Sequence, residues 1–334
     1  MNITAKQIAE MVNVSKQAVY SVLSNKPKCL VSPEKKEKIL FLAKAYHYKP
    51  NTAAVSLNGK STFQVGAVVD SFASIEGRIA SYLASKLEIE NYTLKVAKIT
   101  SIKQGYEMIH NFISSGADAV VFSGRRFPDI NYGDYRVPLL GIDREFGFDY
   151  YGGSKKITDH LIKEHGYTKI LHIASEAGPY PKYLGYCDAM KDAGLKALPV
   201  LHTIMNPDFN DSLKKYLDQG VNAFVTSGDN TAALLIYYLR TLGLRVPEDA
   251  AVTGFDHFCS FPEITTVSFN IDETARTGCR MLLEKIRSKN LAPVAPQFTV
   301  PELKPAASCG CPPVIFDHIA EFYSEDGLIS RLQP

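Results

Sequence analysis

Apolar and polar residues near the N-terminus alternate with the spacing of three short amphipathic helices. Thr4 and Gln7 form a capping box ahead of the first helix, and Ser15 caps the second. Ser32 and the proline after it open the third, because proline is favoured at the first helical position. The predicted buried faces are Ile8, Ala9 and Met11, then Ala18, Val19, Val22 and Leu23, and last Ile39, Leu42, Ala43 and Tyr46. Two short helices joined at a tight break and supported by a third predict a helix-turn-helix unit.

From residue 63 onward, short apolar runs alternate with amphipathic helical stretches. The predicted strands are residues 63–69, 92–99, 119–122, 137–142, 170–173, 223–226 and 250–253. The predicted helices are residues 78–90, 104–115, 154–165, 183–193 and 230–242. This alternation predicts an α/β fold in which parallel sheets are covered by helices on both faces. Because the stretch is long for one sheet, we expect two lobes with a cleft between them.

The charge of the chain is unevenly distributed. The first 60 residues carry ten lysines against three acidic residues, a net charge of +7, while the remainder carries 27 basic and 32 acidic side chains. A basic block of this size joined to a mildly acidic body indicates a polyanion partner for the N-terminal unit. The alternative, a disordered lysine-rich tail, conflicts with the patterned apolar residues of the block.

The rest of the composition is that of an ordinary globular protein, with 46% hydrophobic and 22% charged residues. No stretch approaches the ~20 uncharged apolar residues that a membrane-spanning helix needs, and the first residues lack the features of a secretory signal. The six cysteines are mostly scattered, which argues against a disulfide framework. We therefore expect a cytoplasmic protein with no membrane partner.

The polar face of the second helix carries Ser15, Lys16, Gln17, Tyr20 and Ser21. A helix lying in a major groove presents such residues near its N-terminal end. Gln17 can form two hydrogen bonds to adenine, and Lys16 can reach guanine or a phosphate. For any single residue a solvated helix face is an equal alternative. For the whole face, together with the basic charge, we expect contact with DNA.

The N-terminal segments ITAKQIAEMVNVSKQAVYSVLSN, VSPEKKEKILFLAKAYHYKPN and AAVSLNGKST resemble the lactose-repressor (LacI/GalR) family of bacterial transcription regulators. The likeness continues in NAFVTSGDNTAALLIYYLRTLGLRVPEDAAVTGFD and ITTVSFNIDETARTGCRMLL, and it covers roughly residues 3–305. It implies a two-lobe core like that of periplasmic sugar-binding proteins. The family often has Ser-Arg where this chain has Tyr20-Ser21, so we expect an operator sequence that differs from the family's common palindrome.

By this resemblance, residues 50–61 form a hinge helix that enters the minor groove of the operator, where Leu57 wedges between base pairs. On the residues alone, a plain linker with a buried leucine is the simpler interpretation. The helix face and the resemblance together indicate DNA contacts from Thr4, Ser15, Lys16, Gln17, Tyr20, Ser21, Ser32, Tyr48, Asn51, Ala54 and Leu57.

Ligands of open α/β sheets bind outside the carboxyl ends of the strands, and Asp143, Asp229 and Asp256 each follow a predicted strand. Carboxylates there can accept paired hydrogen bonds from the hydroxyls of a sugar. The alternatives are a helix cap for Asp229, a loop cap for Asp256, and an ion pair between Asp143 and Arg144. By the resemblance, Lys182 stands where the family often has an effector-binding arginine. The expected effector contacts are Asp70, Asp143, Arg144, Lys182, Asp229, Phe255 and Asp256.

The sequence lacks a phosphate-binding loop, a serine-nucleophile elbow and a His-Glu-x-x-His zinc motif. Cys309 and Cys311 lie close together with His318 nearby, but two thiolates and one histidine fall short of a four-ligand site. We therefore expect no enzymatic activity, no metal and no cofactor.

These features together predict a DNA-binding transcription regulator, a repressor, controlled by a small molecule that we expect to be a sugar or a sugar derivative. We expect an all-α helix-turn-helix headpiece at residues 1–49, the hinge at 50–61, a core for effector binding and dimerisation at 62–305, and a tail of uncertain role at 306–334. One headpiece reads half of a palindromic operator, so we expect a homodimer. The alternative is a different class of function: a solute-binding module whose headpiece contacts another protein.

Overall fold

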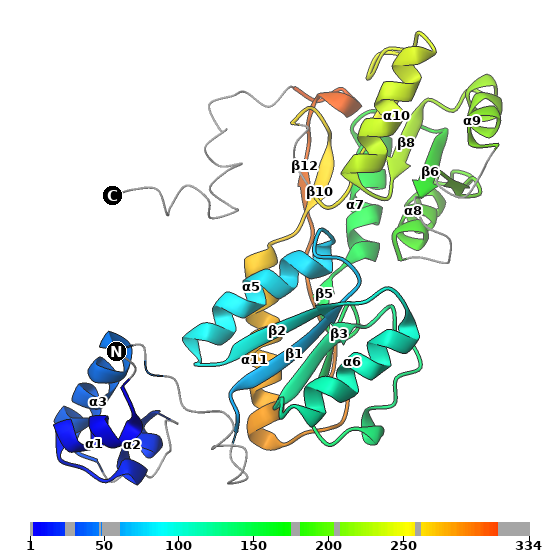
Figure 1. Ribbon diagram of the computed structural model, residues 1–334. Helices are drawn as coiled ribbons and strands as arrows, with labels where there is room; N and C mark the ends of the chain where they lie inside the picture. Colours follow the sequence, from blue (N-terminus) through cyan, green and yellow to red (C-terminus); the bar gives the residue numbers. More distant parts are fainter. Residues whose placement is uncertain are drawn as a thin grey trace.

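The computed structural model describes residues 3–23, 31–46, 48, 61–174, 181–203, 208–257 and 262–312. Three N-terminal helices form a headpiece, and most of the remaining described chain forms two α/β lobes joined at a narrow waist (Figure 1). The fold class predicted from the sequence is confirmed. The predicted hinge with Asn51, Ala54 and Leu57 lies outside the described residues, apart from its last residue, Ser61, and so does the chain from residue 313.

The headpiece consists of α1 (Ala5–Val12), α2 (Lys16–Leu23) and α3 (Pro33–Ala45). α1 begins with the predicted capping box between Thr4 and Gln7 and ends at Asn13, whose φ of 53° is left-handed. Residues from all three helices close a small hydrophobic core, which includes Ile8, Val12, Val19, Val22, Ile39 and Leu42. This core fixes the angle between α1 and α2, as the predicted helix-turn-helix unit requires.

Three details of the headpiece differ from the prediction. Met11 and Tyr46 are 49% and 43% exposed. The buried face of α1 runs through Ala5, Ile8, Ala9 and Val12, which leaves Met11 to one side, and Tyr46 follows the last residue of α3. Ser32 stands at the cap position of α3, but its side chain makes no capping hydrogen bond within the described residues.

The N-terminal lobe is built on a six-stranded parallel sheet of order β11-β5-β4-β3-β1-β2. Its strands are β1 (Gln64–Val69), β2 (Thr93–Lys98), β3 (Ala119–Ser123), β4 (Leu139–Ile142), β5 (Phe146–Phe148) and β11 (Gln297–Thr299). Val65 and Ala67 belong to the same core cluster as α5 (Ile75–Ile89) and α11 (Ile271–Ser288). Val68, pointing the other way, packs with α6 (Ile102–Ser114). Helices thus cover both faces of the sheet.

The C-terminal lobe has a four-stranded parallel sheet of order β7-β6-β8-β9. Its strands are β6 (Ile170–Ala174), β7 (Leu201–His202), β8 (Ala223–Thr226) and β9 (Ala251–Thr253), and its helices are α7 (Tyr150–Lys163), α8 (Pro181–Asp192), α9 (Phe209–Asp218) and α10 (Asp229–Thr241). An antiparallel pair, β10 (Thr266–Ser268) and β12 (Glu302–Lys304), lies beside α7 and leads to the short 3-10 helix η2 (Ala307–Cys309). Residues 306–312, expected to begin a tail, therefore belong to this lobe.

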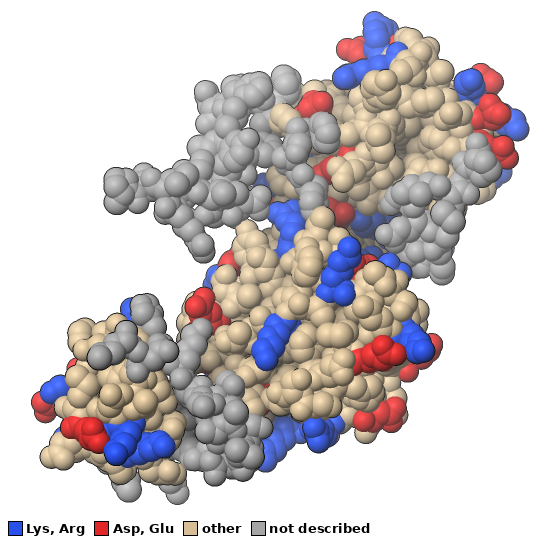
Figure 2. Space-filling model, viewed as in Figure 1, with Lys and Arg blue, Asp and Glu red and all other residues tan. Residues whose placement is uncertain are grey.

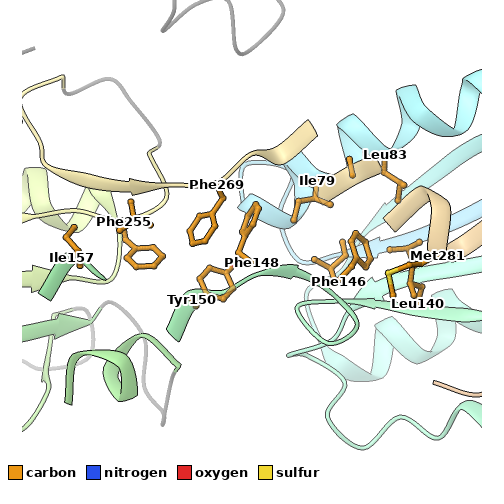
Figure 3. Close-up of a cluster of buried hydrophobic side chains, with 14 of the residues drawn as sticks. Ile79, Leu83, Leu140, Phe146, Phe148, Tyr150, Ile157, Phe255, Phe269 and Met281 are labelled. Atoms are coloured by element: carbon orange, nitrogen blue, oxygen red, sulfur yellow. The ribbon is translucent and has the colours of Figure 1, made fainter. Parts of the chain in front are cut away.

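The chain crosses between the lobes three times, after β5, after β10 and after β11 (Figure 1). Aromatic rings fill the junction: Phe148 stacks on Phe269 with ring centroids 4.4 Å apart, and Tyr150 and Phe255 complete the group. Figure 3 shows these rings linking the core of one lobe to that of the other. The junction is apolar at its centre, so the polar cleft described below lies against a packed aromatic floor.

All the strands predicted from the sequence are present with bounds within two residues, and the predicted helices are present with bounds within four. The prediction omitted β5 and β7, which have three and two residues, and also α9, α11 and the strands after β9. β5 and β7 are too short to show a periodic pattern. None of the helices in the described ranges is long and apolar enough to cross a membrane.

Candidate functional site

The first turn of α2 presents the exposed polar face of the headpiece. Ser15 precedes the helix, and its Oγ accepts a hydrogen bond of 3.1 Å from the backbone N–H of Ala18. Lys16 and Gln17 are exposed, while Ser21 is half-buried one turn later. Val19 and Val22 hold the opposite face in the core. The helix is therefore anchored on one side and offers a lysine and an amide to a partner on the other.

Tyr20 and Tyr48 have a structural contact in addition to any role in binding. Both are half-buried, and burial followed by the charge and hydrogen bond of Tyr20 raises the pKa of Tyr48 to about 12. The Nζ of Lys16 lies 5.7 Å from the centre of the Tyr20 ring. Tyr48 thus braces α2 from the chain that follows α3, which orients the residues of the first turn.

A cleft of about 300 Å³ lies between the two lobes, at the carboxyl ends of β1, β3, β6, β8 and β9. The N-terminal lobe contributes Asp70, Ser74, Glu76 and Arg125, and the C-terminal lobe contributes Lys182, Asp229, Phe255 and Asp256 among others. Figure 2 shows basic and acidic side chains gathered at this waist. Parallel strands bring their carboxyl ends to one edge, which explains why residues so distant in sequence meet here.

On the C-terminal wall, the Nζ of Lys182 is held by three contacts. It donates to the backbone oxygen of Ser227 at 2.7 Å and to Asp256 Oδ1 at 3.2 Å, and it lies 3.9 Å from the centre of the Phe255 ring. Burial lowers the pKa of Lys182, and the neighbouring Asp256 carboxylate opposes that shift. The lysine therefore fixes the loop after β9, and it presents a point charge where an arginine would present a planar fork.

On the N-terminal wall, Arg125 connects two buried carboxyl groups. Its Nη2 lies 2.9 Å from Asp143 Oδ2 and 3.8 Å from Glu76 Oε1. The hydroxyl of Tyr150 donates to the same Asp143 oxygen at 3.2 Å. The guanidinium also lies 5.1 Å from the centre of the Tyr150 ring. This network joins the loop after β3 to the first residue of α7 across the lobe boundary.

The proposed pairing of Asp143 with Arg144 is wrong: Asp143, only 2% exposed, pairs with Arg125. Arg144 turns the other way, donates to the backbone oxygens of Phe127 and Pro128, and stacks on Tyr132 at 5.3 Å. The main chain of Asp143 has a φ of 58°, so the turn directs consecutive side chains to different sides. Neither Asp143 nor Arg144 is among the described residues that line the cleft.

The other five expected effector contacts, Asp70, Lys182, Asp229, Phe255 and Asp256, line the cleft together. Asp229 is the first residue of α10 and not its cap, which is Gly228, and its Oδ1 accepts a hydrogen bond of 2.6 Å from the Thr266 hydroxyl. Asp70 accepts from Arg126 at 3.1 Å. Each carboxylate in the cleft is therefore already engaged by the protein on one side.

Several buried polar atoms in residues that line the cleft have no partner among the described residues. These are Asp70 Oδ1, Glu76 Oε2 and both ring nitrogens of His172. Burial raises the pKa of Glu76 to about 7, against the lowering effect of a hydrogen bond from Ser123. Burial also lowers the pKa of His172 to about 3, so the imidazole is neutral at neutral pH. Buried groups of this kind are costly unless a ligand or water completes their hydrogen bonds.

Four further residues line the cleft that were not expected from the sequence: Glu76, Arg125, Tyr150 and His172. The position of Arg125 could have indicated a role in the cleft, because it follows the predicted strand at residues 119–122 by three positions, at the sheet edge where ligands bind. His172 lies within a strand, and Glu76 lies in the first turn of α5. Strands and helix faces carry polar residues for many reasons, so their patterns did not single out these two.

Comparisons with known proteins agree with this architecture. Residues 158–309 match the profile of the periplasmic binding protein-like domain. The ribose operon repressor of Halalkalibacterium halodurans is 23% identical over 311 residues, which cover 86% of this chain and 92% of that protein. The regulator NtdR of the NTD biosynthesis operon in Bacillus subtilis is 28% identical over 316 residues, which cover 85% and 92%.

Among solved structures, the lac repressor dimer bound to operator and the anti-inducer ONPF superposes with a TM-score of 0.68 at 19% identity, and the match covers 92% of this chain and 99% of that chain. A helix-turn-helix headpiece joined to a two-lobe periplasmic-binding-protein-like core is the class of protein that the fold defines. Along most of its length the chain is similar to regulators of the LacI/GalR family, at 22–28% sequence identity.

Proposed function

We propose that this protein is a sequence-specific DNA-binding transcription regulator, a repressor, whose operator affinity is set by a neutral polyhydroxylated small molecule bound between the two lobes. It is a regulator and not an enzyme. The observation that carries the proposal is the presence, in one chain, of an exposed basic helix face and an interlobe cleft whose buried polar atoms lack partners. The relatives described above are transcription regulators, which supports the same function.

The headpiece supplies the DNA contacts. Lys16 and Gln17 stand at the exposed start of α2, where a helix in the major groove meets base edges. Gln17 has the two-pronged amide that recognises adenine, and Lys16 has the charge for guanine or a phosphate. Thr4 and Ser32 lie at the N-terminal ends of α1 and α3, where backbone N–H groups favour a phosphate oxygen.

The cleft chemistry favours a neutral ligand with several hydroxyl groups. The charged side chains Lys182, Asp256 and Arg125 are engaged with one another or with Asp143, so no unpaired charge among them calls for an ionic ligand. The neutral His172 ring offers one donor and one acceptor, and Glu76 and Asp70 each offer an oxygen. A volume of about 300 Å³ lies at the lower end of ligand pockets. A sugar or sugar derivative meets these requirements.

Ligand binding controls DNA affinity through the angle between the lobes. The cleft draws residues from both lobes, so a ligand that contacts Glu76 and His172 together favours one degree of closure. It shifts the balance only by its difference in affinity for the two states. In a homodimer on a palindromic operator, closure changes the spacing of the two headpieces, and the predicted hinge at residues 50–61 transmits that change.

The proposal is tested by selecting bound duplexes from a random-sequence pool and sequencing them, with fluorescence anisotropy to measure affinity. We expect one palindromic sequence. For each tenfold rise in salt concentration, the logarithm of the association constant should fall by about 0.9 per phosphate contact. The matched control is the double variant Lys16→Ala, Gln17→Ala, which should recover no preferred sequence. If the intact chain recovers none, with or without cell metabolites, or binds independently of salt, the proposal fails. Neutral sugars are then screened for release of the recovered operator.

A further inference from the structure

Two histidines and two cysteines meet on the C-terminal lobe, away from the cleft. His160 lies in the last turn of α7, and His165 follows that helix by two residues. Cys309 ends η2, and Cys311 comes two residues later. The pairs are 144 to 151 residues apart in sequence. In the sequence, only His318 lies near the two thiols, and it falls outside the described residues; the fold brings two other imidazoles to them.

The sulfur–nitrogen and nitrogen–nitrogen distances among the four ligand atoms are those of a tetrahedral zinc site. Each Sγ lies 3.5 Å from His160 Nε2 and 3.4 Å from His165 Nε2, the two Nε2 atoms are 3.2 Å apart, and all four atoms lie within 4.8 Å of one another. Tetrahedral zinc with Zn–S of about 2.3 Å and Zn–N of about 2.05 Å requires S···N edges of about 3.5 Å and an N···N edge of about 3.3 Å. The observed edges match these values closely.

We propose that His160, His165, Cys309 and Cys311 bind one Zn²⁺ ion in a structural Cys₂His₂ site. Two thiolates balance the charge of the ion, and two neutral imidazoles complete the coordination. Thiolate and imidazole donors in a tetrahedron are preferred by zinc over magnesium or calcium, which take oxygen ligands. Four protein ligands leave no open position for water or a substrate, so the site is structural and not catalytic.

The surroundings of the cluster hold its cysteines in place. Cys309 is fully buried, and the Thr265 hydroxyl lies 2.9 Å from its Sγ. The backbone N–H of Thr265 donates to Ser308 Oγ, which in turn donates to the backbone oxygen of Val252. Gly310 has a φ of 100°, a conformation that lets the two thiols of Cys-Gly-Cys point to the same side. Hydrogen bonds around metal ligands orient them in this manner.

The ion would fasten the end of the described core to the end of α7. Without the ion, the hydrogen bonds of Thr265 and Ser308 still hold the segment after β12 against the lobe. None of the four residues is among those lining the cleft. Zinc should therefore stabilise the C-terminal lobe without contributing to effector recognition, and its test does not depend on DNA binding.

The first experiment measures metal in the full-length protein purified under reducing conditions. We expect one zinc per chain by mass spectrometry, and a melting temperature that falls on chelation and recovers on adding Zn²⁺. Apo protein titrated with Co²⁺ should develop intense visible bands of tetrahedral cobalt and a thiolate charge-transfer band. Failure to bind zinc at micromolar concentration, or the weak bands of octahedral cobalt, overturns the proposal.

Variants then assign the ligands. Cys311→Ser and His165→Gln, both at half-buried positions, should each lower zinc affinity by more than about 100-fold, while Cys187→Ser and His110→Gln should retain the ion. Cys311→His replaces one zinc ligand by another and should keep the metal, which separates loss of a ligand from loss of the fold. Zinc retained at full affinity by Cys311→Ser and His165→Gln contradicts the assignment.

Discussion

The headpiece and the interlobe cleft use their polar residues under different constraints. Gln17 and Lys16 stand exposed on a helix whose other face is packed. In the cleft, Arg125 and Lys182 are bound to carboxyl groups of which one is only 2% exposed. The headpiece can therefore exchange its functional side chains at little cost to folding, because water replaces what is lost. The cleft cannot exchange Arg125 in this way, because Arg125 is also the partner of the buried Asp143 carboxyl.

The largest effect that separates the two regions should come from Arg125. Arg125→Met leaves the Asp143 carboxyl buried without its cation, so we expect a loss of about 3–5 kcal/mol in the free energy of unfolding. The matched variant is Arg126→Met. Its ion pair with Asp70 has side-chain exposures of 57% and 28%, so its loss should stay below about 1 kcal/mol.

Urea unfolding of both variants at pH 7 measures this difference. Burial already raises the pKa of Asp143, and the Arg125 charge opposes that shift. In the Arg125→Met variant the carboxyl takes up a proton more readily, so the loss should shrink when the measurement is repeated in acid. Equal losses for the two arginine variants, at either pH, would show that the cleft ion pair is no more structural than a surface one.

Glu76 should give the cleft a pH dependence that the headpiece lacks. Its pKa rises from 4.5 to about 7 on folding because of burial. The folded state then holds the proton more tightly, so this stabilisation is complete below about pH 4.5 and is lost as the pH rises to about 7, by roughly 3 kcal/mol at most. Glu76→Gln should remove that dependence, because the amide does not titrate.

Unfolding free energies of the native protein and Glu76→Gln, measured between pH 4.5 and 8, test this. The control is Glu90→Gln, at an exposed carboxylate paired with Arg287, which should leave the pH profile of the native protein unchanged. A Glu76→Gln profile parallel to that of the native protein would mean that Glu76 is ionised in the folded state throughout this range.

The same contrast explains what the sequence could predict. The caps at Thr4 and Ser15, the break between the first two helices and the buried face of α2 depend on residues a few positions apart, and the structure agrees with them. The strand ends indicated Asp229 and Asp256, and the family resemblance indicated Lys182; all three line the cleft. Side-chain partners on different strands were not predictable. Because the main chain at Asp143 is left-handed, its carboxyl group pairs with Arg125 and not with the adjacent Arg144. The Cys and His cluster joins segments about 150 residues apart, and no local pattern connects them.

In the headpiece, Gln17→Ala should change binding without changing folding. Loss of a two-pronged contact to a base costs about 1–3 kcal/mol, so affinity for the selected operator should fall about 5- to 150-fold, while binding to random DNA stays nearly constant. The unfolding free energy should move by less than about 0.5 kcal/mol, because the side chain is exposed. Gln219→Ala on the C-terminal lobe is the matched control. Equal weakening on both kinds of DNA would remove Gln17 as a base-reading residue.

The smallest effect concerns two predicted helix caps that the structure treats differently. Thr4 accepts from the backbone N–H of Gln7 at 3.3 Å, and its own N–H donates to the Gln7 side chain at 2.8 Å. Ser32 makes no such side-chain bond within the described residues, although proline follows it as predicted. Thr4→Ala should therefore cost about 1 kcal/mol, and Ser32→Ala a few tenths at most.

Amide hydrogen exchange in the full chain resolves so small a difference, because it reports the opening of each helix separately. A cost of about 1 kcal/mol corresponds to about fivefold faster exchange in α1 of Thr4→Ala, whereas α3 of Ser32→Ala should exchange at nearly its original rate. Equally fast exchange in both variants would mean that Ser32 caps α3 in solution. In that case the two caps would stabilise their helices equally, despite the difference between their hydrogen bonds in the structure.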